Sequence, residues 1–347
     1  MVSLQEAYTQ GQWPKGQIGL RDAVGGELAA LCRGVDNSGH NMITTYDVDQ
    51  QSALLKGWNQ TYDQMSSGRF SGSFREASLD ELYLFREVTS VALYQSGCLQ
   101  NDLLAVGIPL VLKGLSTFCG QPCRGSQLHL FSGSGGFEFN SPSDLDIIGI
   151  SMPWKSFTAN LQDEEVSQIS KALSVAGVVA ASPVKLHRLC KLVADIFELS
   201  AISKDAPQTA RQVAAIQQDL REALLEATLP ETPKENLSDS RKARLIREAR
   251  RLAAIDRPEG PVTIEELCKT LGVSRRTLQY SFIDMTGMPP ATYLRLARLN
   301  GARRGLKAAT SVTEVATIWG FWHLGRFAQD YKALFGETPS LTLQRAQ

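Results

Sequence analysis

The chain has 347 residues, enough for two or more domains of about 150 residues each. Apolar residues make up 43% and charged residues 21%, which excludes collagen-like, low-complexity and largely disordered chains. No apolar run reaches the roughly 18 residues that cross a bilayer, and the first residues lack the basic stretch and apolar core of a secretory signal. Six scattered cysteines do not make a disulfide scaffold and indicate a reducing cytoplasm.

Basic and acidic residues number 36 each, but the two signs are unevenly distributed. Residues 236–347 hold 18 basic and 10 acidic residues, so this segment has a net charge of +8 and the remaining 235 residues have −8. A basic segment attracts a polyanion such as nucleic acid, and an acidic segment is kept away from it. The asymmetry therefore indicates two functions in one chain, although many basic faces are only solvated.

Residues 1 to about 60 show no clear pattern beyond a brief helical stretch at 27–32. From Arg69 to Phe157, short apolar runs with partial alternation are separated by Gly, Pro, Ser and Asp at intervals of about 8–15 residues, which predicts antiparallel strands in a barrel or sandwich. The expected interior positions are Phe74, Leu82, Leu84, Val91, Leu93, Leu110, Phe137, Phe139, Ile148 and Ile150. Barrels commonly hold one small molecule, so this interior is the candidate ligand pocket. Side chains that could contribute to it are Trp58, Trp154, Arg69, Arg75 and Arg86.

From Asp163 onward the apolar spacing becomes helical and predicts two longer helices at about 184–200 and 208–228. Together they could form a hairpin with an apolar stripe. Such a stripe packs against the β-rich domain or forms a dimer interface, and the pattern leaves both possibilities open. Residues 229–240 carry two prolines and many polar residues, so they are a candidate linker.

The last third of the chain contains one pattern twice. Residues 267–273 align with 315–321 at an offset of 48, and residues 282–290 align with 331–339 at an offset of 49, through a small residue, a glycine, an aromatic residue and a proline. Each copy predicts a helix-turn-helix, in which a glycine turns the chain between two crossing helices.

The expected helix boundaries follow from capping residues. In the first copy, Thr263 is the expected N-cap of the first helix, Gly272 makes the turn and Ser274 caps the second helix. In the second copy, the second helix is expected at about 323–335. One helix at 291–307 should join the two copies.

A helix fits the major groove of DNA, where arginine binds guanine and glutamine binds adenine through paired hydrogen bonds. Two helices joined rigidly by a third would enter successive major grooves, about 34 Å apart on one face of the duplex. The alternative is a helical bundle whose outward arginines and glutamines are simply solvated. Two copies in register, within the basic segment, favour DNA binding.

The segment TIEELCKTLGVSRRTLQYSFIDMTGMPPATYLRLARLNGARRGL, followed by VTEVATIWGFWHLGRFAQDYKALFGETPS, resembles the AraC/XylS family of bacterial transcriptional regulators. The resemblance covers about the last hundred residues and includes the GF…F…YK..FG.TP signature. It implies two helix-turn-helix subdomains bridged by a long helix, often preceded by a β-barrel effector domain and a helical dimerisation hairpin. The GFWHLGRFAQDY segment and residues 68–97 resemble, within the family, regulators of ethanolamine utilisation.

The resemblance implies particular DNA contacts. Base contacts are implied for Arg276, Gln279 and Tyr280 in the first recognition helix and for Leu324, Gly325, Arg326 and Gln329 in the second. Phosphate contacts are expected from Ser274, Arg275, Arg303 and Arg304. Leu324 and Gly325 depart from the family pattern because neither offers a side-chain hydrogen bond, so the second helix is expected to read fewer bases or to act mainly on phosphate.

Other chemistries are weakly indicated. Cys119, Cys123 and His129 could recruit a metal, but structural zinc usually takes four ligands at tighter spacing, so buried thiols are expected instead. The glycine-rich residues 132–136 lack the lysine of a phosphate-binding P-loop and are expected to form a hairpin loop. We expect no catalytic residue, cofactor or metal.

We therefore predict an α+β protein with a β-barrel-like effector-sensing domain at 1–160, a helical dimerisation or packing segment at 161–229, a linker at 230–240 and an AraC-type DNA-binding domain with two helix-turn-helix units at 241–347. The predicted function is a cytoplasmic, ligand-responsive activator that binds double-stranded DNA as a homodimer, without a membrane partner; RNA polymerase is a partner implied by the resemblance. The alternatives are a small-molecule enzyme on the β-domain with a helical docking module, and an adaptor that works through protein contacts.

Overall fold

The computed structural model describes residues 42–100, 102–123, 127–131, 135–159, 161–173, 176–202, 210–228, 241–253 and 260–347. The expected helical stretch at 27–32 and the expected linker at 230–240 lie outside these residues. We call the described residues between 42 and 228 the N-terminal unit and those between 241 and 347 the C-terminal unit. Within the described residues, no helix is both long enough and apolar enough to span a membrane.

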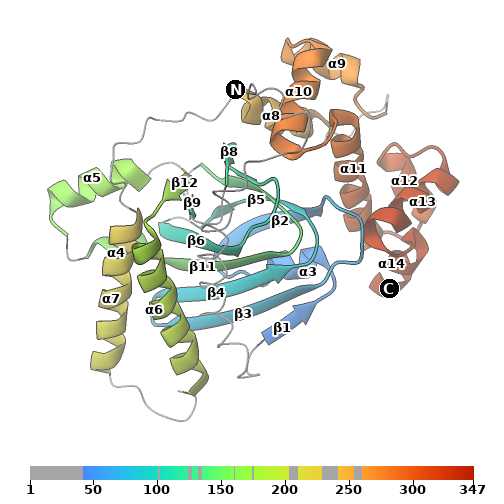
Figure 1. Ribbon diagram of the computed structural model, residues 1–347. Coiled ribbons are helices and arrows are strands. Elements are labelled where there is room, and N and C mark those ends of the chain that lie inside the picture. Colours follow the sequence, from blue (N-terminus) through green and yellow to red (C-terminus); the bar gives the residue numbers. More distant parts are fainter. Residues whose placement is uncertain are drawn as a thin grey trace, which may run out of the picture.

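The N-terminal unit is built on two antiparallel β-sheets (Figure 1). The seven-stranded sheet has the order β1-β3-β4-β11-β6-β9-β12, and the five-stranded sheet has the order β2-β5-β10-β7-β8. The strands are β1 (Met42–Thr45), β2 (Trp58–Gln64), β3 (Gly72–Leu79), β4 (Leu82–Thr89), β5 (Leu93–Leu99), β6 (Leu103–Val111), β7 (Thr117–Phe118), β8 (Gln121–Pro122), β9 (Gln127–Phe131), β10 (Phe137–Ser141), β11 (Leu145–Pro153) and β12 (Gly177–Ala180). The described strands pair only within their own sheet, so the expected barrel is not closed.

The chain passes from the seven-stranded sheet to the five-stranded sheet between β9 and β10. β9 pairs with β6 and β12 in one sheet, whereas β10 pairs with β5 and β7 in the other. The prediction of a hairpin loop at 132–136 is therefore wrong, because β9 and β10 do not pair with each other. Residues 132–134 themselves lie outside the described residues.

Side-chain alternation gives the seven-stranded sheet two buried faces. On β6, Val106 and Ile108 face the helices of the N-terminal unit, whereas Ala105 joins an aromatic core between the sheets. On β9, Leu128 and Leu130 face the helices, and Phe131 faces the aromatic core. The ten interior positions expected from the sequence are all buried.

The helices that come after β11 in the N-terminal unit are α4 (Trp154–Thr158), α5 (Asp163–Leu173), α6 (Pro183–Ile202) and α7 (Ala210–Thr228), and β12 lies between α5 and α6. The last two helices, α6 and α7, form the expected hairpin and cover one face of the seven-stranded sheet (Figure 1). Leu189 and Val193 of α6 and Leu220 and Leu224 of α7 are almost fully buried in that core. For these side chains packing against the sheet is confirmed, while dimerisation through the hairpin stays a prediction.

The C-terminal unit is all helical. Its described helices are α8 (Arg241–Ala253), α9 (Ile264–Leu271), α10 (Arg275–Thr286), α11 (Pro290–Leu306), α12 (Val312–Ile318), α13 (Leu324–Phe335) and α14 (Pro339–Ala346). A further helix, α3 (Val48–Ala53), lies in the N-terminal unit. Tyr293 and Leu294 of α11 pack in one core with α8 to α10, and Leu299 and Leu306 pack in a second core with α12 to α14. The bridging helix expected at 291–307 is therefore present and belongs to both cores.

Candidate nucleic-acid interface

The first helix-turn-helix consists of α9 and α10, and its ends are fixed by local contacts. The Thr263 side chain accepts a hydrogen bond from the backbone N–H of Glu266, whose carboxylate accepts one from the N–H of Thr263. Gly272 ends α9 with φ of 63°, a conformation that glycine adopts without strain. Ser274 then caps α10 by accepting from the N–H of Thr277 at 3.1 Å. The two expected caps and the expected turn are confirmed.

The start of α10 faces away from the protein core. Leu278 and Phe282 are fully buried on its inner face. The expected DNA-contacting residues of this helix, all exposed, are Ser274, Arg275, Arg276, Gln279 and Tyr280. The Arg276 guanidinium lies 5.3 Å from the centre of the Tyr280 ring, so the ring supports one face of the group that would read a base.

The second helix-turn-helix, α12 and α13, repeats this construction. Ala316 is fully buried where the helices cross, and Phe327 and Tyr331 are the buried aromatic residues of α13. The expected base-contacting residues Leu324, Gly325, Arg326 and Gln329 are all exposed. The helix begins at Leu324, one residue after the expected start, and His323 occupies the N-cap position without a side-chain capping bond.

The bridging helix α11 is joined to the second helix-turn-helix by two further contacts. Arg295 of α11 forms an ion pair with Asp330 of α13. Gly301 of α11 lies against the Trp319 ring, where an added Cβ would overlap ring atoms. The second helix-turn-helix is thus packed closely on the bridge, as rigid presentation of two recognition helices requires.

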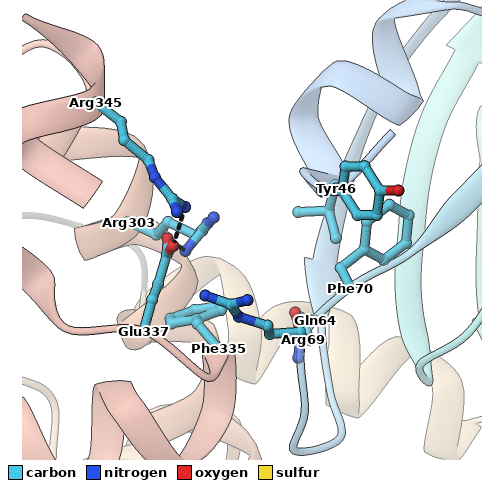
Figure 2. A pocket seen from close by; sticks show the side chains of 9 residues that line it. Tyr46, Gln64, Arg69, Phe70, Arg303, Phe335, Glu337 and Arg345 are labelled. Atoms are coloured by element: carbon cyan, nitrogen blue, oxygen red, sulfur yellow. Dashed lines mark hydrogen bonds and ion pairs between the residues drawn. The ribbon is translucent and has the colours of Figure 1, made fainter. Parts of the chain in front are cut away.

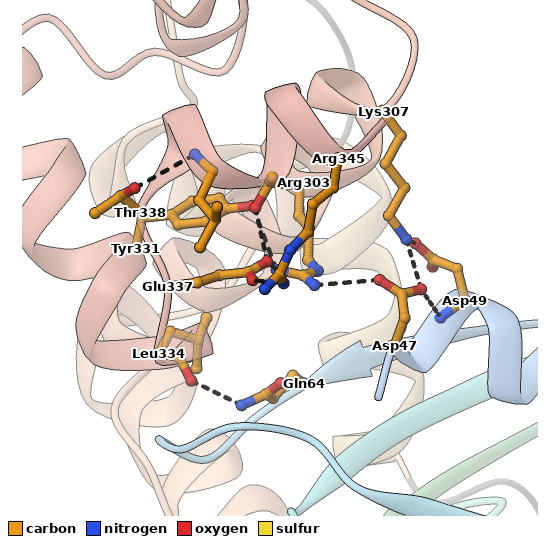
Figure 3. A network of polar contacts seen from close by, with 12 residues as sticks. Asp47, Asp49, Gln64, Arg303, Lys307, Tyr331, Leu334, Glu337, Thr338 and Arg345 are labelled. Carbon is orange, nitrogen blue, oxygen red and sulfur yellow. Dashed lines mark hydrogen bonds and ion pairs between the residues drawn. The ribbon is translucent and has the colours of Figure 1, made fainter. Parts of the chain in front are cut away.

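Two of the arginines expected to contact phosphate are engaged elsewhere. Arg303 is only 9% exposed, and it bonds to Asp47 at 3.1 Å and to Glu337 at 2.7 Å (Figure 3). Arg304 bonds to Asp63 at 2.6 Å. Arg303 therefore does not face solvent as expected, because it is buried and bound by Asp47 and Glu337. The Arg304 side chain is bound by Asp63 but is 39% exposed, so its contact with phosphate stays a prediction.

The same acidic residues bind further cations of the C-terminal unit. Lys307 bonds to Asp47 at 2.6 Å, and Arg250 forms an ion pair with the buried Asp63. Burial alone would raise the pKa of Asp47, but Lys307 and Arg303 outweigh burial and hold it below its ordinary value. Asp47 is therefore charged at neutral pH and attracts both cations.

Neutral hydrogen bonds add to the contact between the units. The backbone N–H of Gln64 donates to Asn300 Oδ1 at 2.7 Å, and Asn300 Nδ2 donates to the Gln64 carbonyl at 2.9 Å. This contact could not be predicted from the sequence, because Gln64, Asp63 and Asp47 lie in or next to a stretch without a clear pattern. The opposite net charges of the two ends of the chain were the available signal.

Both recognition helices touch the N-terminal unit with their C-terminal ends. The Met285 carbonyl near the end of α10 accepts a hydrogen bond from Thr117 Oγ1 at 3.5 Å. The Leu334 carbonyl near the end of α13 accepts bonds from Gln64 Nε2 at 2.7 Å and from the Gly68 N–H at 3.0 Å (Figure 3). The opposite ends of both helices, which carry the expected base-contacting residues, are exposed.

The residues proposed for an internal ligand pocket are scattered. Trp58 packs in the aromatic core between the sheets, with its ring centre 4.7 Å from that of Phe131. Arg75 lies under Phe197 on the helix side of the sheet, and Arg86 forms an ion pair with Asp146 at 2.8 Å. The other two members are Trp154, which packs beside the helices, and Arg69, which lines a cavity between the two units.

Two of the three candidate metal ligands, Cys123 and His129, are buried, whereas Cys119 is partly exposed. Burial raises the pKa of Cys123 to about 12 and lowers the pKa of His129 to about 3. The His129 ring stacks on Phe118, with ring centres 4.6 Å apart. Over the described residues, no three His, Cys, Asp or Glu side chains are grouped as a metal site would need.

Comparison with known proteins identifies the family. Residues 267–345 match a helix-turn-helix domain model. A probable thc operon regulatory protein of Rhodococcus erythropolis is 41% identical over 88 residues, which are 24% of this chain and 26% of that protein. The crystal structure of a probable AraC family transcriptional regulator from Rhodopseudomonas palustris CGA009 is 38% identical, covers 30% of this chain and 98% of its own, and has a TM-score of 0.27. The chain belongs to the AraC family of transcriptional regulators.

The family relationship is carried by the C-terminal unit. The matched segment spans about a quarter of the length of the Rhodococcus relative. The crystal structure of the AraC-like transcriptional activator CuxR covers 81% of this AraC family protein and 100% of its own chain, at 16% identity and a TM-score of 0.42. The closer resemblance to regulators of ethanolamine utilisation stays a prediction.

Proposed function

We propose that this AraC family protein is a ligand-responsive transcriptional activator that binds double-stranded DNA in a sequence-specific manner. The observation that carries the proposal is the matched presentation of α10 and α13. Each helix exposes polar side chains at its N-terminal end and anchors its C-terminal end on the N-terminal unit. Residues at the start of a recognition helix reach deepest into a major groove.

The side chains divide into base and phosphate contacts. Arg276 and Arg326 have the donor geometry that reads guanine, and Gln279 and Gln329 have the paired groups that read adenine. Tyr280, Leu324 and Gly325 complete the set of base-facing residues, and Leu324 can pack on a thymine methyl group. Ser274 and Arg275 would hold phosphate at the start of α10.

The remaining parts of the proposal concern organisation. The boundaries are those expected from the sequence: effector sensing at 1–160, the helical segment at 161–229, a linker at 230–240 and DNA binding at 241–347. The helical segment would also mediate homodimerisation, RNA polymerase would be the partner at a promoter, and the protein would act in the cytoplasm without enzymatic activity. The family membership of the C-terminal unit and the opposite charges of the two ends support this organisation.

The test is footprinting on duplexes selected from a random pool by the full chain. Arg276→Ala should weaken binding to the selected site by about 1–3 kcal/mol and relax the preference at one base pair. Arg188→Ala removes an exposed arginine of α6 and serves as the matched control. Protection of the same site at the same concentration by Arg276→Ala would rule out the base contact. An adaptor working through protein contacts would show no preference for any duplex over random DNA.

A further inference from the structure

A cavity of about 380 Å³ lies between the N-terminal and C-terminal units. Figure 2 shows Arg303, Glu337 and Arg345 of the C-terminal unit on one side and Tyr46 and Phe70 of the N-terminal unit on the other. The volume falls within the range of pockets that hold small molecules, about 300–1,000 Å³. We infer that this cavity binds a small organic acid, through a carboxylate head and an apolar body.

The charge of the cavity favours an anion. Three arginines and one glutamate line it, so the lining side chains carry a surplus of positive charge. Glu337 is already occupied, because it accepts hydrogen bonds from Arg303 at 2.7 Å, Arg345 at 2.5 Å and Thr342 at 2.8 Å. A cationic ligand would have to displace one of these donors, whereas an anion would find donors in place.

Arg69 is the lining arginine that forms no ion pair within the described parts of the chain. It has no ion pair or hydrogen bond to any residue in the described parts of the chain, although its aliphatic stem packs against Gly336 of the C-terminal unit. Arg345 lies across the cavity with its side chain 60% exposed, so its guanidinium retains donors beyond those that bind Glu337. A carboxylate between Arg69 and Arg345 would gain charge-assisted hydrogen bonds from both units.

The apolar lining requires more than an inorganic ion. Val48, Phe70 and Phe335 are nearly fully buried and line the cavity together with the ring of Tyr46. A bare anion would leave this surface in contact with water, whereas a ring or short chain attached to the carboxylate would cover it. The combination of a cationic site for the head group and an apolar wall therefore selects an organic acid that carries a ring or chain over phosphate or acetate.

The position of the cavity suggests its consequence, which rests on the proposed function. Arg345 belongs to α14 and Phe335 to the end of α13, so the ligand would join the second helix-turn-helix to the N-terminal unit. The lining residues include none from α9 or α10 of the first helix-turn-helix. Ligand binding would thus stabilise the docked position of the second recognition helix while making no contact with the first.

The test is calorimetric titration of the full chain with phenylacetate and hexanoate. Phenylacetamide and hexanamide serve as neutral analogues, and acetate and inorganic phosphate serve as head groups without an apolar body. We expect both organic acids to bind at least tenfold more tightly than the amides and the small anions. Arg69→Met, which keeps the stem on Gly336, and Arg345→Met should each weaken phenylacetate at least tenfold, whereas Arg188→Met should not.

Several results would overturn the inference: no binding of either acid, equal binding of acid and amide, equal binding of phosphate and phenylacetate, or unchanged affinity in both Arg69→Met and Arg345→Met. Both arginines are exposed, and thermal unfolding of the variants verifies that they fold. The titration contains no DNA, so its failure leaves the footprinting result intact. Conversely, loss of DNA recognition would not remove acid binding, which distinguishes the two failures.

Discussion

Neutralising Asp47 should loosen the contact between the two units without disturbing the fold of either. Asp47 has two tasks: its carboxylate caps α3 by accepting from the N–H of Asp49 at 3.0 Å, and it bonds to Arg303 and Lys307 across the contact. Asparagine caps helices as well as aspartate does, so Asp47→Asn keeps the cap and removes only the charge. The substitution therefore isolates the contribution of the ion pairs.

The magnitude follows from what each cation retains. A hydrogen bond to a charged group contributes about 1.5–3 kcal/mol, and stranding a buried charge costs about 3–5 kcal/mol. Arg303 keeps Glu337 at 2.7 Å and Lys307 keeps Asp49, so neither is stranded. We expect Asp47→Asn to weaken docking by about 2 kcal/mol, a factor of about 30 in the ratio of docked to undocked protein.

Hydrogen exchange reports this ratio directly. The backbone N–H of Gln64 donates to Asn300 across the contact, so it exchanges when the units separate. In Asp47→Asn its exchange should accelerate about 30-fold, whereas the N–H of Val106, in the centre of the seven-stranded sheet, should exchange at the wild-type rate. Equal rates at Gln64 in both proteins, or equal acceleration at both positions, would refute the reasoning. Because the pKa of Asp47 is lowered, wild-type docking should persist above pH 4 and weaken as the pH falls through that lowered value.

Three further predictions concern stability. Burial raises the pKa of Glu87 to about 7, so between about pH 4.5 and 7 the folded chain holds a proton that the unfolded chain has lost, and the free energy of unfolding falls by up to about 3 kcal/mol as the pH rises. Urea titrations at pH 5 and pH 8 measure this fall, and Glu87→Gln should remove it. The same fall between the two pH values in Glu87→Gln would contradict the assignment. Gly301→Ala should destabilise the C-terminal unit by about 1–2 kcal/mol, because the overlap with Trp319 outweighs the gain in helix propensity; a raised melting temperature would show that Trp319 moves freely. Thr263→Ala should cost about 1 kcal/mol by removing the cap of α9, whereas Thr263→Ser should be close to neutral in the same denaturation assay.

The C-terminal unit could be predicted from the sequence because its determinants are local. A cap, a glycine and a helical apolar period lie within a few residues of one another, and each fixes its own part of the chain. Gly272 and Ser274 ended and began helices as predicted, and the hairpin helices expected at 184–200 and 208–228 were found at 183–202 and 210–228. The repeated pattern then identified the second helix-turn-helix as a copy of the first, without any information on long-range contacts.

The sheet arrangement could not be predicted in the same way. Alternation identifies which residues of a strand are buried, and it placed Phe139 and Ile148 correctly. It does not identify the neighbouring strand, because pairing depends on contacts far apart in the sequence. The interpretation of residues 132–136 as a hairpin failed for this reason, since consecutive strands there belong to opposite sheets.

The contact between the units was missed because it buries polar residues. β2 has the sequence WNQTYDQ, in which Asp63 and Gln64 are polar and nevertheless only 2% exposed. A strand that buries polar groups shows no apolar alternation, so the sequence pattern does not reveal it. These groups are buried because arginines and Asn300 of the C-terminal unit, more than 180 residues later, supply their hydrogen-bond partners.

Basic residues of the C-terminal segment thus bind acidic residues within the protein as well as being available to DNA. Arg250, Arg303, Arg304 and Lys307 belong to the basic segment, and all four bind carboxylates of the acidic segment. The N-terminal unit therefore binds Arg303 and Arg304, for which phosphate contacts were expected, while the exposed ends of α10 and α13 remain clear of the contact. The proposed base contacts and the docking contacts therefore involve different residues of one basic segment. The N-terminal unit binds the C-terminal ends of both recognition helices, so a change in that unit can alter the position of one helix relative to the other. This relative position decides whether two half-sites on one face of a duplex are read at once.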